Sequence, residues 1–70
     1  MQQLGVAIRE ARRQRRLSIS EVHYRTRLSH QAITKIERGK VYPRIDTLLS
    51  ICQALEVKPS SLFVTVDSRL

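Results

Sequence analysis

The sequence has few of the residues that stabilise other kinds of small protein. It contains one cysteine, which excludes an internal disulfide, and no tryptophan. Aromatic residues make up only 4% of its 70 residues, so the core must be compact and built from aliphatic side chains. The two histidines and the single cysteine do not have the spacing of metal ligands, and we expect neither a metal nor another cofactor. These absences favour a small all-helical domain.

Segments that direct a protein to a membrane are also absent from the sequence. No apolar run approaches the roughly 20 residues that a membrane-spanning helix requires. Residues 1–8 do not form a signal-peptide apolar region, because arginines follow them at once. We therefore expect a cytoplasmic protein that does not associate with membranes.

Acidic residues are scarce in the first two thirds of the chain. Residues 1–44 hold 11 Lys and Arg against 3 Asp and Glu, whereas residues 45–70 hold 2 against 3. A net charge of +7 distributed in this way is typical of a protein that meets a polyanion on one side. The simpler alternative is a soluble helical bundle with a basic surface.

Residues 18–39 have the pattern of two short helices joined by a tight turn. Ser18 and Glu21 form an S-x-x-E capping box that begins the first helix. Ser29 is a second candidate N-cap, and Gly39 is suited to the left-handed conformation just past a helix end. The expected apolar positions of this pair are Val22, Leu28, Ile33 and Ile36.

The second of these helices has one polar face. Ile33 and Ile36 occupy the other face, which leaves four polar or charged side chains on the first: His30, Gln31, Thr34 and Lys35. A helix with such a face suits the major groove of DNA, which displays a base-specific pattern of donors and acceptors. The pattern predicts a helix-turn-helix in which residues 29–38 form the recognition helix.

Apolar periodicity predicts further helices on both sides of this pair. The first would bury Leu4, Ala7, Ile8 and Ala11. A fourth would bury Ile45, Leu48, Leu49, Cys52 and Leu55, with Ile51 at its margin and Cys52 acting as a small hydrophobe. A short last helix should begin at Pro59, and Phe63 should fill a gap in the core.

The last seven residues differ in character from the rest. Residues 64–70 favour an extended conformation, so we predict a domain over residues 1–63 and a short extended C-terminal tail. The tail could pair with the tail of a second chain and form a homodimer. Alternatively it is frayed, and dimers form only on DNA through the fourth and fifth helices.

Three segments in order carry a resemblance to a known family: Leu17-Ser18, residues 33–40 and residues 43–49. Together they resemble the Cro/lambda-repressor-like, or XRE-type, helix-turn-helix family over about residues 4–63. The resemblance implies a compact bundle of about five helices that binds double-stranded DNA, usually as a dimer. It places His30, Gln31 and Lys35 at base edges, with Thr34 beside them.

The resemblance also assigns roles outside the recognition helix. Ser18, Arg38, Lys40 and Arg44 take positions at which family members contact phosphates, and Tyr42 lies close by. Arg12 and Glu37 take the positions of a structural ion pair. Three residues depart from the family pattern: His23 replaces a small residue, Thr26 an apolar one, and Arg27 a glycine.

We expect a sequence-specific DNA-binding transcriptional regulator, a repressor acting as a dimer, with no small-molecule ligand. The alternative is a protein-interaction module on the same fold, because the turn formed by residues 26–28 also resembles that of helix-turn-helix domains in bacterial cell-shape proteins. The polar recognition helix lacks the apolar anchor that such an interface usually has. We do not expect an enzyme, because no nucleophile or carboxylate is placed beside His23 or His30 so as to suggest a catalytic set.

Overall fold

The computed structural model describes residues 2–62, and all regular secondary structure in this part of the chain is helical. The helices are α1 (Gln2–Gln14), α2 (Ile19–Thr26), α3 (His30–Glu37) and α4 (Ile45–Leu55). A further helical turn begins at Pro59, as predicted. The expected roles of Phe63 and of the tail over residues 64–70 lie outside the described residues.

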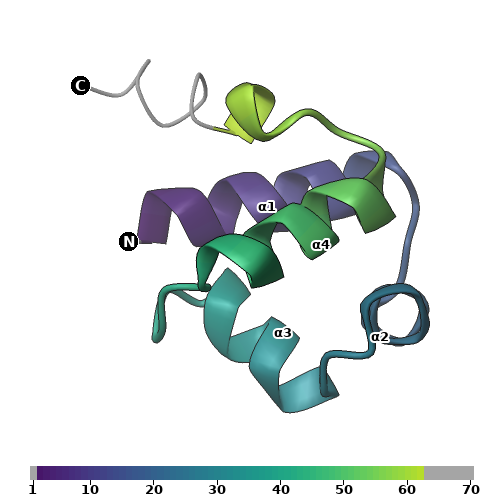
Figure 1. Ribbon diagram of the computed structural model, residues 1–70, viewed down its shortest axis with the longest axis horizontal. Coiled ribbons are helices and arrows are strands. Elements are labelled where there is room, and N and C mark those ends of the chain that lie inside the picture. The colour runs from purple at the N-terminus through teal and green to yellow at the C-terminus, as the bar shows by residue number, and fades with distance from the viewer. Residues whose placement is uncertain (1, 63–70) are drawn as a thin grey trace.

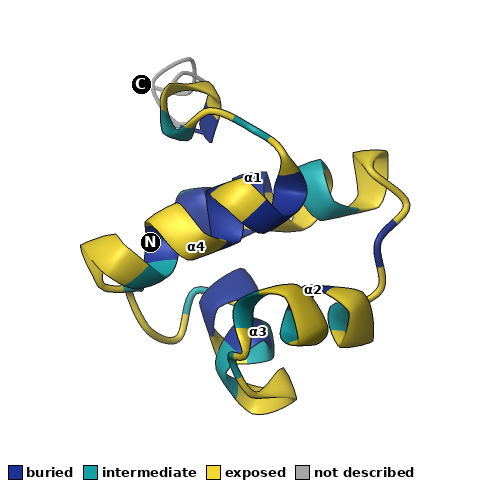
Figure 2. Ribbon diagram, turned by 45° about the vertical axis from the view of Figure 1, so that its right-hand side comes forward, coloured by how far each residue is buried: buried dark blue, intermediate teal, exposed yellow. Residues whose placement is uncertain are grey.

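Figure 1 shows α2 and α3 together on one side of α1 and α4. Helix α3 packs against both α1 and α2, and α2 also packs against α4. The recognition helix is therefore held from two directions, while its remaining face is exposed to solvent (Figure 2).

The core is aliphatic, as the scarcity of aromatic residues predicted. Its members come from α1, the α1–α2 connection, each of the other three helices and the final turn: Leu4, Ala7, Ile8, Leu17, Val22, Ile33, Ile36, Leu48, Ile51, Cys52, Leu55 and Leu62. Leu28 in the turn and Ala11 are partly buried and pack against this cluster. The buried position of Cys52 confirms its predicted role as a small hydrophobe.

The predicted buried face of α4 was partly wrong. Ile51, expected at the margin, is 1% exposed, whereas Ile45 and Leu49 are 72% and 50% exposed. Helix α4 has two overlapping apolar stripes with helical spacing, so periodicity alone could not choose between them. The buried stripe is the one that contains Ile51, together with Leu48, Cys52 and Leu55.

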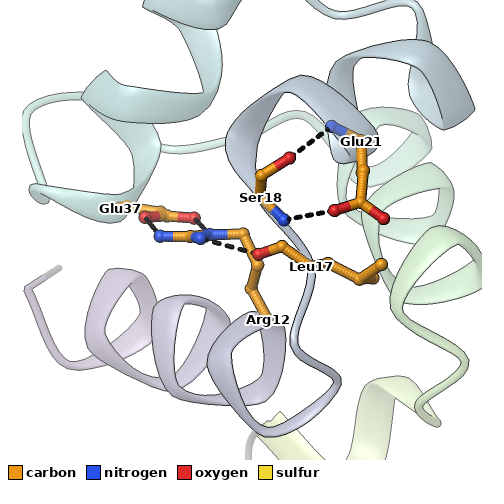
Figure 3. Close-up of polar contacts among 5 residues, drawn as sticks. All are labelled: Arg12, Leu17, Ser18, Glu21 and Glu37. Carbon is orange, nitrogen blue, oxygen red and sulfur yellow. Dashed lines mark hydrogen bonds and ion pairs between the residues drawn. The ribbon is translucent and has the colours of Figure 1, made fainter.

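Both helices of the helix-turn-helix begin at the predicted caps. The Ser18 hydroxyl accepts a hydrogen bond from the Glu21 N–H at 3.1 Å, and the Glu21 carboxylate accepts one from the Ser18 N–H at 3.0 Å (Figure 3). The bond from the Ser18 N–H, together with the Ser18 hydroxyl, lowers the pKa of Glu21 from its ordinary value. Ser29 caps α3 by accepting from the Ala32 N–H at 3.0 Å.

The turn between α2 and α3 contains a strained residue. Arg27 has φ 66°, in the left-handed region that the family usually fills with glycine at this position. An L-residue with a Cβ loses about 1 kcal/mol in this conformation. After α3 the same conformation falls on Gly39, with φ 74°, where it is free of this strain.

Candidate nucleic-acid interface

The predicted base-contacting residues lie together on the exposed side of α3. His30, Gln31 and Lys35 are exposed and Thr34 is half-buried, whereas Ile33 and Ile36 on the opposite side enter the core. One surface depression, called here the recognition face, is lined by His30, Gln31, Thr34, Lys35, Arg38 and Lys40. Two of the predicted phosphate-contacting residues, Arg38 and Lys40, therefore border the same surface as the four base-contacting candidates.

The other predicted phosphate contacts lie outside the recognition face. Ser18 is exposed at the start of α2, where its hydroxyl already accepts the capping bond. Tyr42 is exposed in the connection between α3 and α4. Arg44 immediately precedes α4, and its Nε lies 3.7 Å from Asp46 Oδ1. The contacts of these three side chains with a DNA backbone stay predictions.

Side chains of α2 fix the turn that precedes α3. The Thr26 hydroxyl donates to the Val22 carbonyl at 2.7 Å and accepts from the Leu28 N–H at 3.1 Å. His23 Nδ1 meets the carbonyl oxygen of Leu28, which can only accept, so this nitrogen carries the proton. Two of the departures from the family pattern thus provide polar contacts that hold the turn.

His23 also contacts the recognition helix directly. Its ring centroid lies 4.8 Å from that of His30 and 5.3 Å from that of Tyr24. This contact could not be predicted from the sequence, because nothing local indicates that the ring of His23 would meet a side chain seven positions later. The structure makes it the neighbour that restricts the orientation of His30.

An ion pair joins α1 to the end of α3, as the family resemblance implied. The Arg12 Nε donates to Glu37 Oε2 at 2.7 Å and a second guanidinium N–H donates to Oε1 at 3.1 Å (Figure 3). The third contact of Arg12 is a bond to the Leu17 carbonyl at 2.9 Å. The side chains are only 13% and 6% exposed. The pair holds α3 against α1, and Arg12 neutralises the charge of the buried Glu37.

Two further arginines of the basic half have structural partners. Arg25 donates to the Ala54 carbonyl at 2.9 Å, and Arg15 donates to the Glu56 carbonyl at 2.8 Å. Both carbonyls lie at the C-terminal end of α4, where a helix leaves acceptors without intrahelical donors and carries a partial negative charge. Part of the charge excess of residues 1–44 therefore serves the fold.

Residues 2–62 hold no group suited to a metal ion. No three His, Cys, Asp or Glu side chains in this range lie close enough to share one. Burial raises the pKa of the Cys52 thiol, which reduces its reactivity as a nucleophile. Within the same residues, no helix is long and apolar enough to cross a membrane.

Two solved structures share this fold over most of their length. The clp gene regulator ClgR from C. glutamicum superimposes with a TM-score of 0.92 and 23% sequence identity, over 99% of this chain and 90% of that one. The restriction-modification controller protein C.AhdI from Aeromonas hydrophila gives a TM-score of 0.82 and 25% identity, over 86% and 91%. A comparison with curated protein sequences found no significant match.

A family model described as a helix-turn-helix domain matches residues 3–62. This range contains all four helices, the capped turn and the recognition face, apart from the first residue of α1. The chain belongs to the helix-turn-helix domain family.

Proposed function

We propose that this protein is a sequence-specific DNA-binding transcriptional regulator that inserts α3 into the major groove. The observation that carries the proposal is the recognition face, where polar and cationic side chains of α3 are exposed together without an apolar anchor. The names of ClgR and C.AhdI, a gene regulator and a controller protein, support the same class of function. No enzymatic role is proposed, and DNA binding implies a cytoplasmic location.

Within this proposal the side chains divide into two groups. Gln31 is suited to a bidentate pair with adenine N6 and N7, and Lys35 to guanine O6 and N7. His30 and Thr34 complete the base-contacting group. The backbone-contacting group comprises Ser18, Arg38, Lys40, Tyr42 and Arg44, which would set position and most of the affinity.

We further propose that the regulator is a homodimer and a repressor. One recognition helix contacts only a few base pairs, whereas two related by a two-fold axis contact half-sites about 34 Å apart. The exposed Ile45 and Leu49 support an interface that includes α4, and a pairing of residues 64–70 is the other candidate. A protein-interaction role would need an aromatic or apolar anchor on α3, and the exposed face of that helix has none.

Alanine substitutions at two positions separate base contact from phosphate contact. After selection of a preferred duplex from random DNA, Gln31→Ala should lose about 1–3 kcal/mol of binding free energy on that duplex and little on random DNA. Arg38→Ala should weaken binding to both duplexes equally, because phosphates carry no sequence information. Fluorescence titrations with both duplexes measure this. Equal losses for both variants on all DNA would show that α3 does not contact the bases.

A further inference from the structure

A second depression lies beside the recognition face, where α1 meets the end of α3. Its lining comes from three helices: Arg9 and Arg12 of α1, Ile19 of α2, and Thr34, Glu37 and Arg38 at and just after the end of α3. Thr34 and Arg38 also line the recognition face, so the two depressions are neighbours. Local sequence patterns do not distinguish Arg9 from the other four arginines of residues 9–16.

The position of Arg9 follows from the close contact between α1 and α3. A Cβ built on Gly5 would lie 2.4 Å from the Ile36 carbonyl oxygen and 2.5 Å from that of Glu37. Arg9 follows Gly5 by four residues, so it lies on the same side of α1, one turn further along. Arg12, which binds Glu37, comes three residues after Arg9. Arg9 therefore lies between two points at which α1 touches the end of α3.

The charges around this depression are unbalanced. Glu37 is its only acid, and the bidentate bond with Arg12 neutralises it. Arg9 and Arg38 are exposed, and their guanidinium groups have no hydrogen bond or ion pair with any other residue of the range 2–62. Two arginines without partners, beside an acid whose charge is neutralised, favour the binding of an anion in this depression.

We propose that Arg9 and Arg38 together bind one phosphate group of the DNA backbone at this depression, an inference that rests on the proposed function. The guanidinium group suits phosphate because its N–H groups donate in parallel to two oxygens. A helix in the major groove has the phosphate backbones at the borders of that groove. The depression adjoins the recognition face through Thr34, so a backbone at the groove border reaches it while α3 contacts the bases. Arg9 is thus a DNA-binding residue of α1.

The test compares two variants that each remove one positive charge from the full-length protein. Arg9→Gln should weaken binding about tenfold on the selected duplex and on random DNA alike. It should also make the slope of log K against log salt shallower, by less than about 1 per bound protomer, because Arg38 still contacts the same phosphate. Lys58→Gln is the matched control, because Lys58 is exposed and belongs to the connection between α4 and the final helical turn, which leads to the side of α1 and α4 away from α3 (Figure 1). It should leave the slope unchanged. Arg9→Lys should keep the slope and lose part of the affinity.

The outcomes distinguish this inference from the proposed function. If the wild-type protein binds DNA and Arg9→Gln behaves like Lys58→Gln in affinity and slope, the phosphate site at Arg9 is wrong and the proposed function stands. If the wild-type protein binds no DNA, both the phosphate site at Arg9 and the proposed function are wrong. A loss confined to the selected duplex would also overturn the inference, because it would assign Arg9 to base contact. Thermal melts of the exposed Arg9 variants should match that of the wild type.

Discussion

Replacing Glu37 with alanine should lower the free energy of unfolding by about 3–5 kcal/mol, because it leaves the charge of Arg12 without its partner in a nearly buried place. The two side chains are 13% and 6% exposed and share two hydrogen bonds. Small domains have a total stability of about 5–15 kcal/mol, and the expected loss is a large share of it. A large fraction of the Glu37→Ala protein should therefore be unfolded near physiological temperature. Thermal and urea unfolding of the purified variant, followed by circular dichroism, measure the loss.

A double-mutant cycle isolates the interaction itself. Arg12→Ala should be similarly destabilising, because it strands the Glu37 carboxylate, and the double variant should lose far less than the sum of the two. Arg44→Ala is the control, because it breaks an ion pair on the surface. The side chains of Arg44 and Asp46 are 86% and 77% exposed. That change should cost at most about 0.5 kcal/mol. Additive losses at Arg12 and Glu37 would contradict the contact between them.

Gly5→Ala should destabilise the protein by about 2 kcal/mol, against the sign that helix propensity predicts. Alanine in place of glycine within a helix ordinarily gains about 1 kcal/mol. Here the new Cβ would meet two backbone oxygens of α3 at 2.4 and 2.5 Å, so α1 must move away from α3. These backbone oxygens cannot relieve the clash by rotating away, as the end of a flexible side chain would. The melting temperature should fall by about 10 °C.

Val6→Ala is the matched control for this substitution. Val6 is the next residue of α1 and is exposed, so its change to alanine should alter stability by no more than about 0.5 kcal/mol. Differential scanning calorimetry of both variants decides the matter. A Gly5→Ala protein that melts above the wild type would show that the two helices are not in backbone contact at this point.

Features set by neighbouring residues could be predicted from the sequence. The caps at Ser18 and Ser29, the end of α3 before Gly39 and the start of a turn at Pro59 are all confirmed, because each depends on local backbone chemistry. The shared face of the four base-contacting candidates follows equally from helical periodicity. The Arg12–Glu37 pair spans 25 positions and came only from the family resemblance.

Features set by contacts between distant segments could not be predicted from local patterns. The buried stripe of α4 depends on where α2 packs, and the requirement for glycine at position 5 depends on the approach of α3. The same holds for the ring contact of His23 with His30 and for the place of Arg9 beside Arg38. The arginines of α1 carry the same charge, so the sequence alone does not show which of them face another helix. The packing of α1 against its neighbours decides this.

The dependence of DNA affinity on salt tests most directly the claim that the basic side of this protein binds nucleic acid. Neutralisation of about six phosphates per dimer predicts a slope of log K against log salt of about −5. Fluorescence anisotropy with a labelled duplex, between low and moderate salt, measures that slope for the wild-type protein. A steep decrease of this size is the result that the proposed function predicts. An affinity that does not change with salt, or no binding at low salt, would contradict it.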